Sequence, residues 1–456
     1  MWSDPLTINQ VTLPNRLVRS SIGGRMAYYD GTVNGAWSNF EKRFAEGGVG
    51  AIISATLTID ERRWSPLEYP KISHDRFIAP LRRGVRKVQA LGTKYLVQLG
   101  DPGYHTQTSL FSQRTDSASA SSGFDLLFGY RNSRFALTTG EVEQVVVNFA
   151  DAARRVRDIG CDGVEVTASK GYLIHQFLNP GINRRTDKYG GSAQARFRLL
   201  AEIVTAIREA VGPDFLFGVR LSARDYNHLP LNLRLPPSLP LRDWWFGNDI
   251  DQTIDYGRQL RDLGVDYLHI SNGFGFINPR ENPGDLPVDE VRMFMDSTAH
   301  LTRKARLRSS LLRLPRALVR PAMNIGWGDA RTLNLDDARR FRAEVGLPVI
   351  ANGGFQRRSD IEAALASGAC DVVSMARPLL ANPDLPKLFA EGHEQPERPC
   401  TFCNRCTIRT TMFPLGCYDR SRFDSDEQME QQIIRWSATL DEQAELDEQA
   451  EELQGT

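Results

Sequence analysis

Short apolar runs alternate with amphipathic stretches along most of the chain, which is typical of repeated strand–helix units around a parallel sheet. Helical periodicity occupies most of the stretches between these runs, for instance at 141–159, 192–211, 251–263 and 359–367. The apolar runs predict eight strands, at residues 17–22, 50–56, 95–100, 163–167, 216–222, 266–271, 348–352 and 371–375. Eight alternations predict an α/β fold of the TIM-barrel type, (β/α)8, over residues 1–395. A doubly wound sheet is the alternative, but the turn after the first strand lacks the Gly-x-Gly-x-x-Gly pattern that such a sheet uses.

Several segments do not fit the strand–helix repeat. Residues 228–248 are rich in proline and predict a long loop over the sixth unit. Residues 303–320 hold seven basic residues and no acidic one, which indicates a solvated loop or, alternatively, a contact with an anionic substrate such as an acyl-CoA. After a four-cysteine segment at 396–423, residues 424–456 predict an acidic helical tail that nearly repeats LDEQAE, either solvated or partly disordered.

Composition narrows the class of protein. The 456 residues include 56 basic and 56 acidic ones, so no overall field favours nucleic acid as a partner. The start of the chain has no basic region followed by an apolar run, and no apolar stretch is long enough to span a membrane. These features predict a cytoplasmic enzyme with a small-molecule substrate. They leave the oligomeric state open, a homo-oligomer included.

The predicted strand ends carry groups suited to a phosphate. The seventh strand is followed by Gly353 and Gly354, and the eighth by Ala376 and Arg377. Paired glycines let backbone N–H groups approach a phosphate, and an arginine beside them neutralises its charge. Because active sites of TIM barrels lie at the carboxyl ends of the strands, a phosphate-bearing cofactor is expected there. A tight turn is the simpler explanation of the glycine pair.

Other strand ends add polar side chains to the same mouth of the barrel, namely Gln98, Thr167, Lys170 and Arg220. Arg220 lies in the apolar run FLFGVRLS, where a buried cation requires an anion. Either Arg220 forms a buried ion pair with Glu165, or it faces an electron-rich cofactor ring. Lys170 either faces this site or points into solvent.

Four of the six cysteines are crowded near the C-terminus, whereas Cys161 and Cys370 are isolated. A reducing cytoplasm disfavours disulfides, so ligation of a metal or cluster is the stronger interpretation. Three cysteines two residues apart and a fourth ten residues later suit a 4Fe–4S cluster. Structural zinc, which more often uses two separated pairs, is the alternative. The predicted ligands are Cys400, Cys403, Cys406 and Cys417.

Residues 171–196 contain a long motif that is similar to one found in a known protein family. The strings GYLIHQFL at 171–178 and NRRTDKYGGS at 183–192, followed by Arg196, are similar to the Old Yellow Enzyme family of FMN-dependent oxidoreductases. Shorter matches occur in the family's order at LPNR, GGVG, VQL and ARP, and the resemblance runs from about Leu13 to Leu388. The cysteines resemble those of its iron–sulfur branch, which includes 2,4-dienoyl-CoA reductase and trimethylamine dehydrogenase. Those relatives continue into a second flavin and pyridine-nucleotide domain, which is not expected here.

The resemblance implies roles for individual residues. Gln98 would bond the pyrimidine edge of FMN, Arg220 would lie beside its N1 and O2, and Tyr172 would donate a proton to the substrate. The backbone at the ends of the first two strands would border the isoalloxazine, at Ser21, Ile22, Gly23 and Ala55. The phosphate would be held by Gly353, Gly354, Ala376 and Arg377.

The sequence also departs from the family. The two histidines, or histidine and asparagine, that usually grip the substrate are replaced by Thr167 and Lys170. A hydroxyl and an ammonium can still polarise a carbonyl, and the ammonium favours an anionic substrate. Gly23 replaces a cysteine or threonine that tunes the flavin, and Asp101 replaces a histidine.

These features together predict an FMN- and 4Fe–4S-dependent oxidoreductase that moves hydride between flavin N5 and the activated C=C of an unsaturated carbonyl or carboxylate compound. NAD(P)H is the expected donor, or else a separate electron-transfer protein. Desaturation or amine oxidation is the alternative on the same scaffold. Rival interpretations are a non-redox TIM-barrel enzyme with structural zinc, and an electron-transfer subunit without a working substrate pocket.

Overall fold

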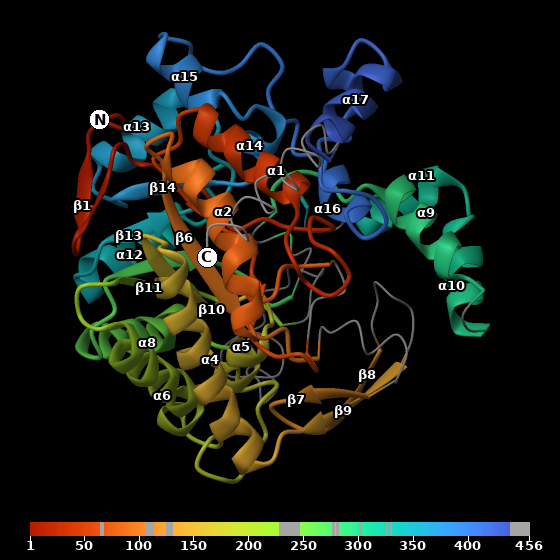
Figure 1. Ribbon diagram of the computed structural model, residues 1–456. Coiled ribbons are helices and arrows are strands. Elements are labelled where there is room, and N and C mark those ends of the chain that lie inside the picture. The colour runs from red at the N-terminus through yellow and green to blue at the C-terminus, as the bar shows by residue number, and fades with distance from the viewer. Residues whose placement is uncertain are drawn as a thin grey trace, which may run out of the picture.

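Figure 1 shows the computed structural model of the protein. The predicted loop at 228–248 lies outside the described residues except for its last two, and so does the end of the predicted tail after Ser437. The described residues are 1–63, 68–104, 114–124, 131–227, 247–275, 279, 282–300, 303–324, 327–328 and 331–437.

Eight parallel strands close into a barrel, which confirms the predicted TIM fold. Each pairs with the next barrel strand in chain order, and the last strand, β14, pairs with the first, β3, to complete the ring. All eight predicted strands are present, with ends shifted by a few residues. They are β3 (Leu17–Arg19), β4 (Ala51–Ile53), β6 (Lys94–Gly100), β10 (Gly163–Ala168), β11 (Leu216–Ser222), β12 (Tyr267–Ser271), β13 (Val349–Ala351) and β14 (Val372–Met375).

Helices surround the barrel, and their ends follow local sequence signals. Thr138 and Glu141 form a reciprocal capping box at the start of α4 (Thr139–Ile159), and Gly160 ends that helix in the left-handed conformation. The other predicted helices are α6 (Ala193–Val211), α8 (Ile250–Asp262) and α13 (Arg358–Ala366). The ring also includes α1 (Gly35–Glu46), α2 (Ile78–Gln89) and α12 (Leu335–Val345) (Figure 1).

The first strand ends three residues earlier than predicted. Arg19 is buried, and its Nη1 donates to the carbonyl oxygens of Ser20 and Ile22 at 3.3 Å each. Its Nη2 pairs with the buried carboxylate of Glu41. Because a side chain takes these carbonyls away from strand pairing, the chain leaves the barrel wall and brings Ser21 toward the mouth.

Short strands lie outside the main repeat. β1 (Leu6–Ile8) and β2 (Val11–Leu13) form an antiparallel pair near the N-terminus, and β5 (Leu57–Thr58) joins the end of β6. Between β6 and α4, a small sheet consists of β7 (Arg114–Ser117), β9 (Arg131–Ala136) and β8 (Ser121–Phe124). The sequence pattern did not predict this sheet because its strands are polar.

The basic stretch 303–320 is helical, which corrects the predicted loop. It forms α10 (Arg303–Leu312) and α11 (Arg316–Met323), which follow α9 (Val288–Thr298). Arginine and leucine favour helices, and the break falls at Pro315. These helices stand beside α16 (Arg405–Arg409) at one side of the barrel (Figure 1). Residues of α9 and α16 share a hydrophobic cluster of Val291, Phe294, Met295 and Ile408.

The remaining α-helices lie after β10 and in the last part of the chain. They are α5 (Leu173–Leu178) after β10, α14 (Arg377–Ala381), α15 (Leu385–Ala390) and α17 (Asp426–Ser437). Among the described residues, no helix combines the length and apolar character required to cross a membrane.

The tight interior of the barrel gives a first prediction. A Cβ placed on Gly218 would lie 2.1 Å from the ring of Tyr267 on the next strand. Gly218→Ala should therefore lower the free energy of unfolding by about 1–3 kcal/mol, through overpacking. Gly140→Ala is the matched control, since nothing lies within 4 Å of its Cβ position. Thermal unfolding of both variants should show a lowered midpoint for Gly218→Ala alone.

Candidate functional site

An ionised carboxylate lies inside the barrel below its mouth. Glu165 on β10 is fully buried. Its Oε1 accepts from Gln98 Nε2 at 2.7 Å, and its Oε2 accepts from the Tyr267 hydroxyl at 3.2 Å. His269 Nδ1 lies 3.0 Å from the same Oε2. Side chains of two other strands, β6 and β12, therefore converge on this carboxylate of β10.

The pKa of Glu165 follows from these neighbours. Burial alone would raise this pKa, but His269, Arg220 and the hydrogen bond from Gln98 outweigh burial and lower it. Burial also lowers the pKa of His269, which favours a neutral ring. The negative charge of Glu165 raises the pKa of Arg220 against the effect of burial. Glu165 is therefore an anionic partner of Arg220, which is one of the two alternatives given by the sequence.

Gln98 has a fixed orientation at the strand end. Its Oε1 accepts from Ser21 Oγ at 3.0 Å and from Thr56 Oγ1, while its Nε2 donates to Glu165. The amide is therefore oriented by residues of three other segments. Thr56 was missed in the sequence, although it directly follows Ala55 at the end of a predicted strand.

Tyr172 faces the same group of residues. Its hydroxyl is hydrogen-bonded to Thr56 and Tyr69, and burial together with Tyr69 raises its pKa well above the ordinary value. Tyr172 is therefore a neutral phenol with a proton to donate. A Cβ on Gly23 would lie 2.5 Å from the Ala55 Cβ, so close packing explains the departure from the family at Gly23.

The motif at 171–178 shapes the turn that carries Lys170 and Tyr172. Lys170 and Gly171 both have left-handed backbone, with φ of 61° and 76°. The Gly171 N–H donates to His175 Nδ1 at 3.0 Å, and the Gly171 carbonyl accepts from Gln176 Nε2 at 2.7 Å. Asp225 holds the other ring nitrogen of His175 at 2.7 Å. Buried side chains of the motif therefore fix this strained turn.

Three cations meet near the mouth. Burial lowers the pKa of Lys170 well below its ordinary value, and the charges of Arg220 and Arg377 add to this effect. Lys170 is only partly accessible, and the charges of Arg220 and Arg377 both act on it. Thr167 is buried nearby, with its Oγ1 3.3 Å from Ser169 Oγ. This concentration of positive charge fits an anionic cofactor or substrate.

The predicted phosphate residues lie at two adjacent strand ends. Gly353 and Gly354 have φ of 109° and 92°, the left-handed region that glycine tolerates, and Ala376 precedes α14. The Arg377 guanidinium also contacts the cysteine segment. It donates to Asn404 Oδ1, and it lies 5.1 Å from the centroid of the Phe402 ring.

The four predicted ligand cysteines are free thiols in one neighbourhood. Burial is the main cause that raises the pKa of Cys400 to about 12, against the opposing effect of Arg377 and with small additions from Cys417 and Cys403. Cys406 is influenced by the same thiols. Within the described residues, no group of three or more His, Cys, Asp or Glu side chains is arranged to hold a metal ion. The donor chemistry fits a cluster, whereas the arrangement is not a closed metal site.

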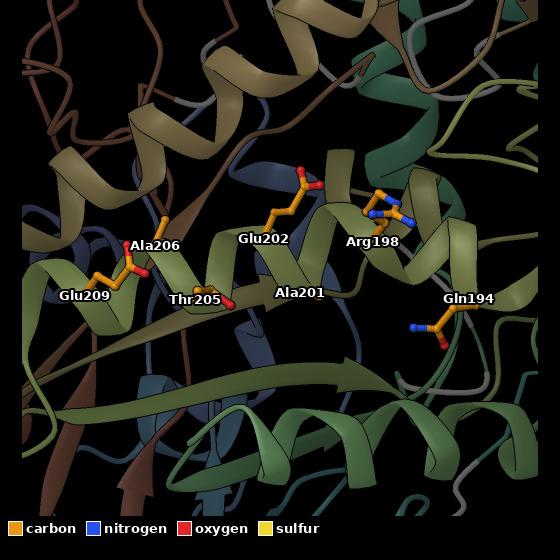
Figure 2. A pocket seen from close by; sticks show the side chains of 7 residues that line it. All are labelled: Gln194, Arg198, Ala201, Glu202, Thr205, Ala206 and Glu209. Atoms are coloured by element: carbon orange, nitrogen blue, oxygen red, sulfur yellow. The ribbon is translucent and has the colours of Figure 1, made fainter.

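One surface hollow lies away from all of these residues. It is lined by a single helix, α6, on the outside of the barrel, and Glu202 within it accepts from the Tyr189 hydroxyl at 2.7 Å (Figure 2). None of the predicted site residues lines it. We therefore assign the chemistry to the strand ends.

Comparison with known proteins gives a family match for this chain. Residues 3–230 and 310–395 match the NADH:flavin oxidoreductase / NADH oxidase family. The chain belongs to this family. The predicted resemblance is thereby confirmed, and the match leaves out residues 231–309, which include α9 and the start of α10.

Individual relatives of this NADH:flavin oxidoreductase family member differ in what they do. A metal reductase of Desulforamulus reducens is 30% identical over 416 residues, covering 91% of this chain and 52% of the relative. An NADH oxidase of Thermoanaerobacter brockii is 26% identical, covering 90% of this chain and 56% of the relative. The chain thus spans about half the length of these curated relatives.

Solved structures show the same fold. A 2-naphthoyl-CoA reductase complex matches with a TM-score of 0.72 and 21% identity, covering 91% of this chain and 56% of that one. Histamine dehydrogenase from Rhizobium sp. 4-9 matches with a TM-score of 0.70 and 21% identity, covering 94% of this chain and 53% of that one. At these identities the likeness supports the barrel fold and no particular substrate.

The three cations of this family member give a second prediction. Arg220→Gln removes one positive charge near Lys170, so the pKa of Lys170 should rise toward its ordinary value. Because the folded pKa of Lys170 is lowered, the folded protein binds fewer protons than the unfolded chain between that pKa and about 10.4, so Lys170 makes stability rise with pH there. The pH dependence of Lys170 acetylation, read by mass spectrometry, should shift upward in Arg220→Gln. An unshifted midpoint would show that Arg220 does not act on Lys170.

Proposed function

We propose that this chain is an FMN- and 4Fe–4S-dependent oxidoreductase that reduces the activated C=C of an unsaturated carbonyl or carboxylate compound. Bound FMN would supply hydride chemistry at its N5 atom. We assign residues 1–395 to the flavin barrel, 396–423 to cluster binding and 424–456 to an acidic helical tail. The observation that carries the proposal is the meeting of a neutral phenol, Tyr172, with the cationic group around Lys170.

The flavin assignment rests on the strand ends. Gln98 presents a fixed amide, and Arg220 adds a buried cation whose pKa burial lowers. Both suit the polar edge of an isoalloxazine, and a cation there favours the reduced, anionic form. Gly23 packs closely against Ala55, so the strand ends proposed to border the isoalloxazine lie side by side. Gly353, Gly354, Ala376 and Arg377 would hold the phosphate.

Lys170, Thr167 and Tyr172 would divide the work on the substrate. Lys170 and Thr167 would donate hydrogen bonds to the carbonyl or carboxylate oxygen on which negative charge develops. Tyr172 would transfer its phenolic proton to the carbon next to the one that receives hydride. The phenolate left behind would regain a proton from solvent through Tyr69 and Thr56, its hydrogen-bond partners. An anionic substrate would also raise the lowered pKa of Lys170, which favours a carboxylate or an acyl-CoA.

The cysteine segment would connect this site with an electron source. A 4Fe–4S cluster on Cys400, Cys403, Cys406 and Cys417 would pass single electrons to or from the flavin. NAD(P)H is the proposed donor, because the family is defined by NADH and flavin. A separate electron-transfer protein is the alternative donor.

The absorption spectrum of the purified protein tests this proposal first. A flavin band with a broad iron–sulfur shoulder is expected. A colourless protein with stoichiometric zinc would instead favour a non-redox barrel enzyme with a structural zinc site. Turnover with unsaturated carboxylates, saturated acids and amines then separates reduction from desaturation and amine oxidation.

Two substitutions test the catalytic roles. Lys170→Met should slow reoxidation of the reduced flavin by substrate by about two to three decades, because one preorganised donor is lost. Tyr172→Phe should slow the same half-reaction by about two to four decades, most strongly for poorly activated alkenes. Reduction of the flavin by its donor should remain nearly unchanged in both. Stopped-flow measurement of the two half-reactions is the test.

Matched variants control for general damage. Lys42→Met removes an exposed lysine of α1, and Tyr256→Phe removes a hydroxyl on α8, so both should reoxidise at the parental rate. Parental rates in Lys170→Met and Tyr172→Phe as well would exclude this mechanism.

The cluster has its own prediction. Replacing any one of Cys400, Cys403, Cys406 or Cys417 by serine should lower iron and labile sulfide while flavin stays bound, because a serine hydroxyl is a poor cluster ligand. Cys161→Ala, at a buried and isolated cysteine, should leave the iron content unchanged. The test is to measure iron, zinc and labile sulfide in anaerobically prepared protein. One equivalent of zinc per chain would contradict the proposed cluster.

A further inference from the structure

The helical hairpin formed by α10 and α11, called here the basic hairpin, has no role in the proposed function. Its sequence at 303–320 holds seven basic residues and no acidic one. The helix α11 contributes no buried residue. Leucines are also exposed along the hairpin, at 62%, 51% and 66% for Leu307, Leu314 and Leu318. A surface that is both cationic and apolar is unusual for a solvated helix and fits a binding partner.

Three of the seven basic residues of the hairpin form ion pairs. Arg313, Arg316 and Arg320 pair with aspartates on the side of α9, at 3.5, 3.0 and 3.0 Å. In the part of the chain that the structure describes, no ion pair involves the exposed Arg303 or Arg306. The excess charge is therefore concentrated at the start of α10, where the sequence reads RKARLR.

The same chain contains a segment of opposite character. Residues 438–456, which lie outside the described residues, hold seven acidic residues and no basic one. They also contain three leucines, at 440, 446 and 453. The carboxylates are thus opposite in charge to the basic hairpin, and the three leucines are of the same kind as its exposed leucines.

Packed side chains connect the helix that precedes residues 438–456 with α9. The helix α17, which leads into 438–456, packs on Tyr418 of the cysteine segment. The Tyr418 ring lies 4.9 Å from the guanidinium of Arg409, and Arg409 lies 3.6 Å from Glu290 on α9. The nineteen residues after Ser437 extend up to roughly 65 Å, more than a small domain's diameter.

We propose that residues 438–456 dock on the basic hairpin of the same chain, with their carboxylates against the start of α10 and their leucines against the exposed leucines. Tethering gives such a contact an effective concentration in the millimolar range, so weak charge pairing populates it. The docked segment competes with other anions for the hairpin, including an anionic substrate or an acidic protein. This proposal depends on neither the flavin nor the cluster.

Cross-linking tests the contact in the intact protein. Carbodiimide joins a carboxylate to an amine with loss of water, and Lys304 is the single lysine within 303–320. At low salt, cross-links between Lys304 and the tryptic peptide 436–456 are expected. An equal mixture of light and 15N-labelled chains should give no mixed product, since the contact lies within one chain.

Charge variants sharpen the result. Arg303→Glu with Arg306→Glu should abolish the Lys304 cross-link, whereas the same reversal at Arg83 and Arg86 on α2 should leave it unchanged. Changing the seven acidic residues of 438–456 to their amides should speed trypsin cleavage after Arg306 by about tenfold, because the site is uncovered. Salt of about 0.5 M should remove this difference by screening.

Two outcomes would overturn the proposal. Equal cleavage rates at low salt, together with no cross-link from Lys304 to 436–456, would show that the hairpin is not covered by this segment. Cross-links between light and heavy chains would instead assign the hairpin to a second copy of the protein.

Discussion

The buried carboxylate of Glu165 constrains the whole mouth of the barrel. An ion removed from water costs several kcal/mol unless other groups replace its hydration. Here Gln98, Tyr267 and His269 supply hydrogen bonds, and Arg220 supplies opposite charge. These partners come from strands that can meet only when the barrel is closed. The fold therefore orients the Gln98 amide, and that amide in turn orders Ser21 and Thr56 at the site.

Sequence pattern predicted the barrel well because its strands are buried on both faces. Runs such as those at β10 and β11 read as continuous apolar stretches, and their order alone fixes which ends share a mouth. The pattern failed where side chains override the backbone preference. Strand β3 ends at Arg19 because the Arg19 guanidinium takes neighbouring carbonyls. The basic helices α10 and α11 were not predicted, because a run of like charges indicates a solvated loop whereas arginine and leucine favour a helix.

The candidate site was predictable only in part, for a related reason. Strand-end positions identified Gln98 and Arg220, since the residue types are unusual in apolar runs. Tyr69 carries no such signal, because it lies in an irregular segment and meets Tyr172 only through the fold. The sequence likewise does not indicate which residues the Arg377 side chain contacts. Its partner Asn404 lies among the cysteines in a left-handed conformation, a backbone that asparagine tolerates.

Arg377 also connects the last strand end of the barrel with the cysteine segment. Its backbone belongs to the strand end with the predicted phosphate site, whereas its guanidinium contacts Asn404 and Phe402 in the cysteine segment. Gly284, with φ of 97°, lets the chain approach Phe402 so closely that a Cβ would lie 1.9 Å from the Phe402 carbonyl oxygen. The Asn404 side chain donates hydrogen bonds to the backbone carbonyls of Pro283 and Asp285, the two neighbours of Gly284. The cysteine segment is thus fixed against the barrel by backbone contacts, so the positions of the two proposed cofactor sites are set together.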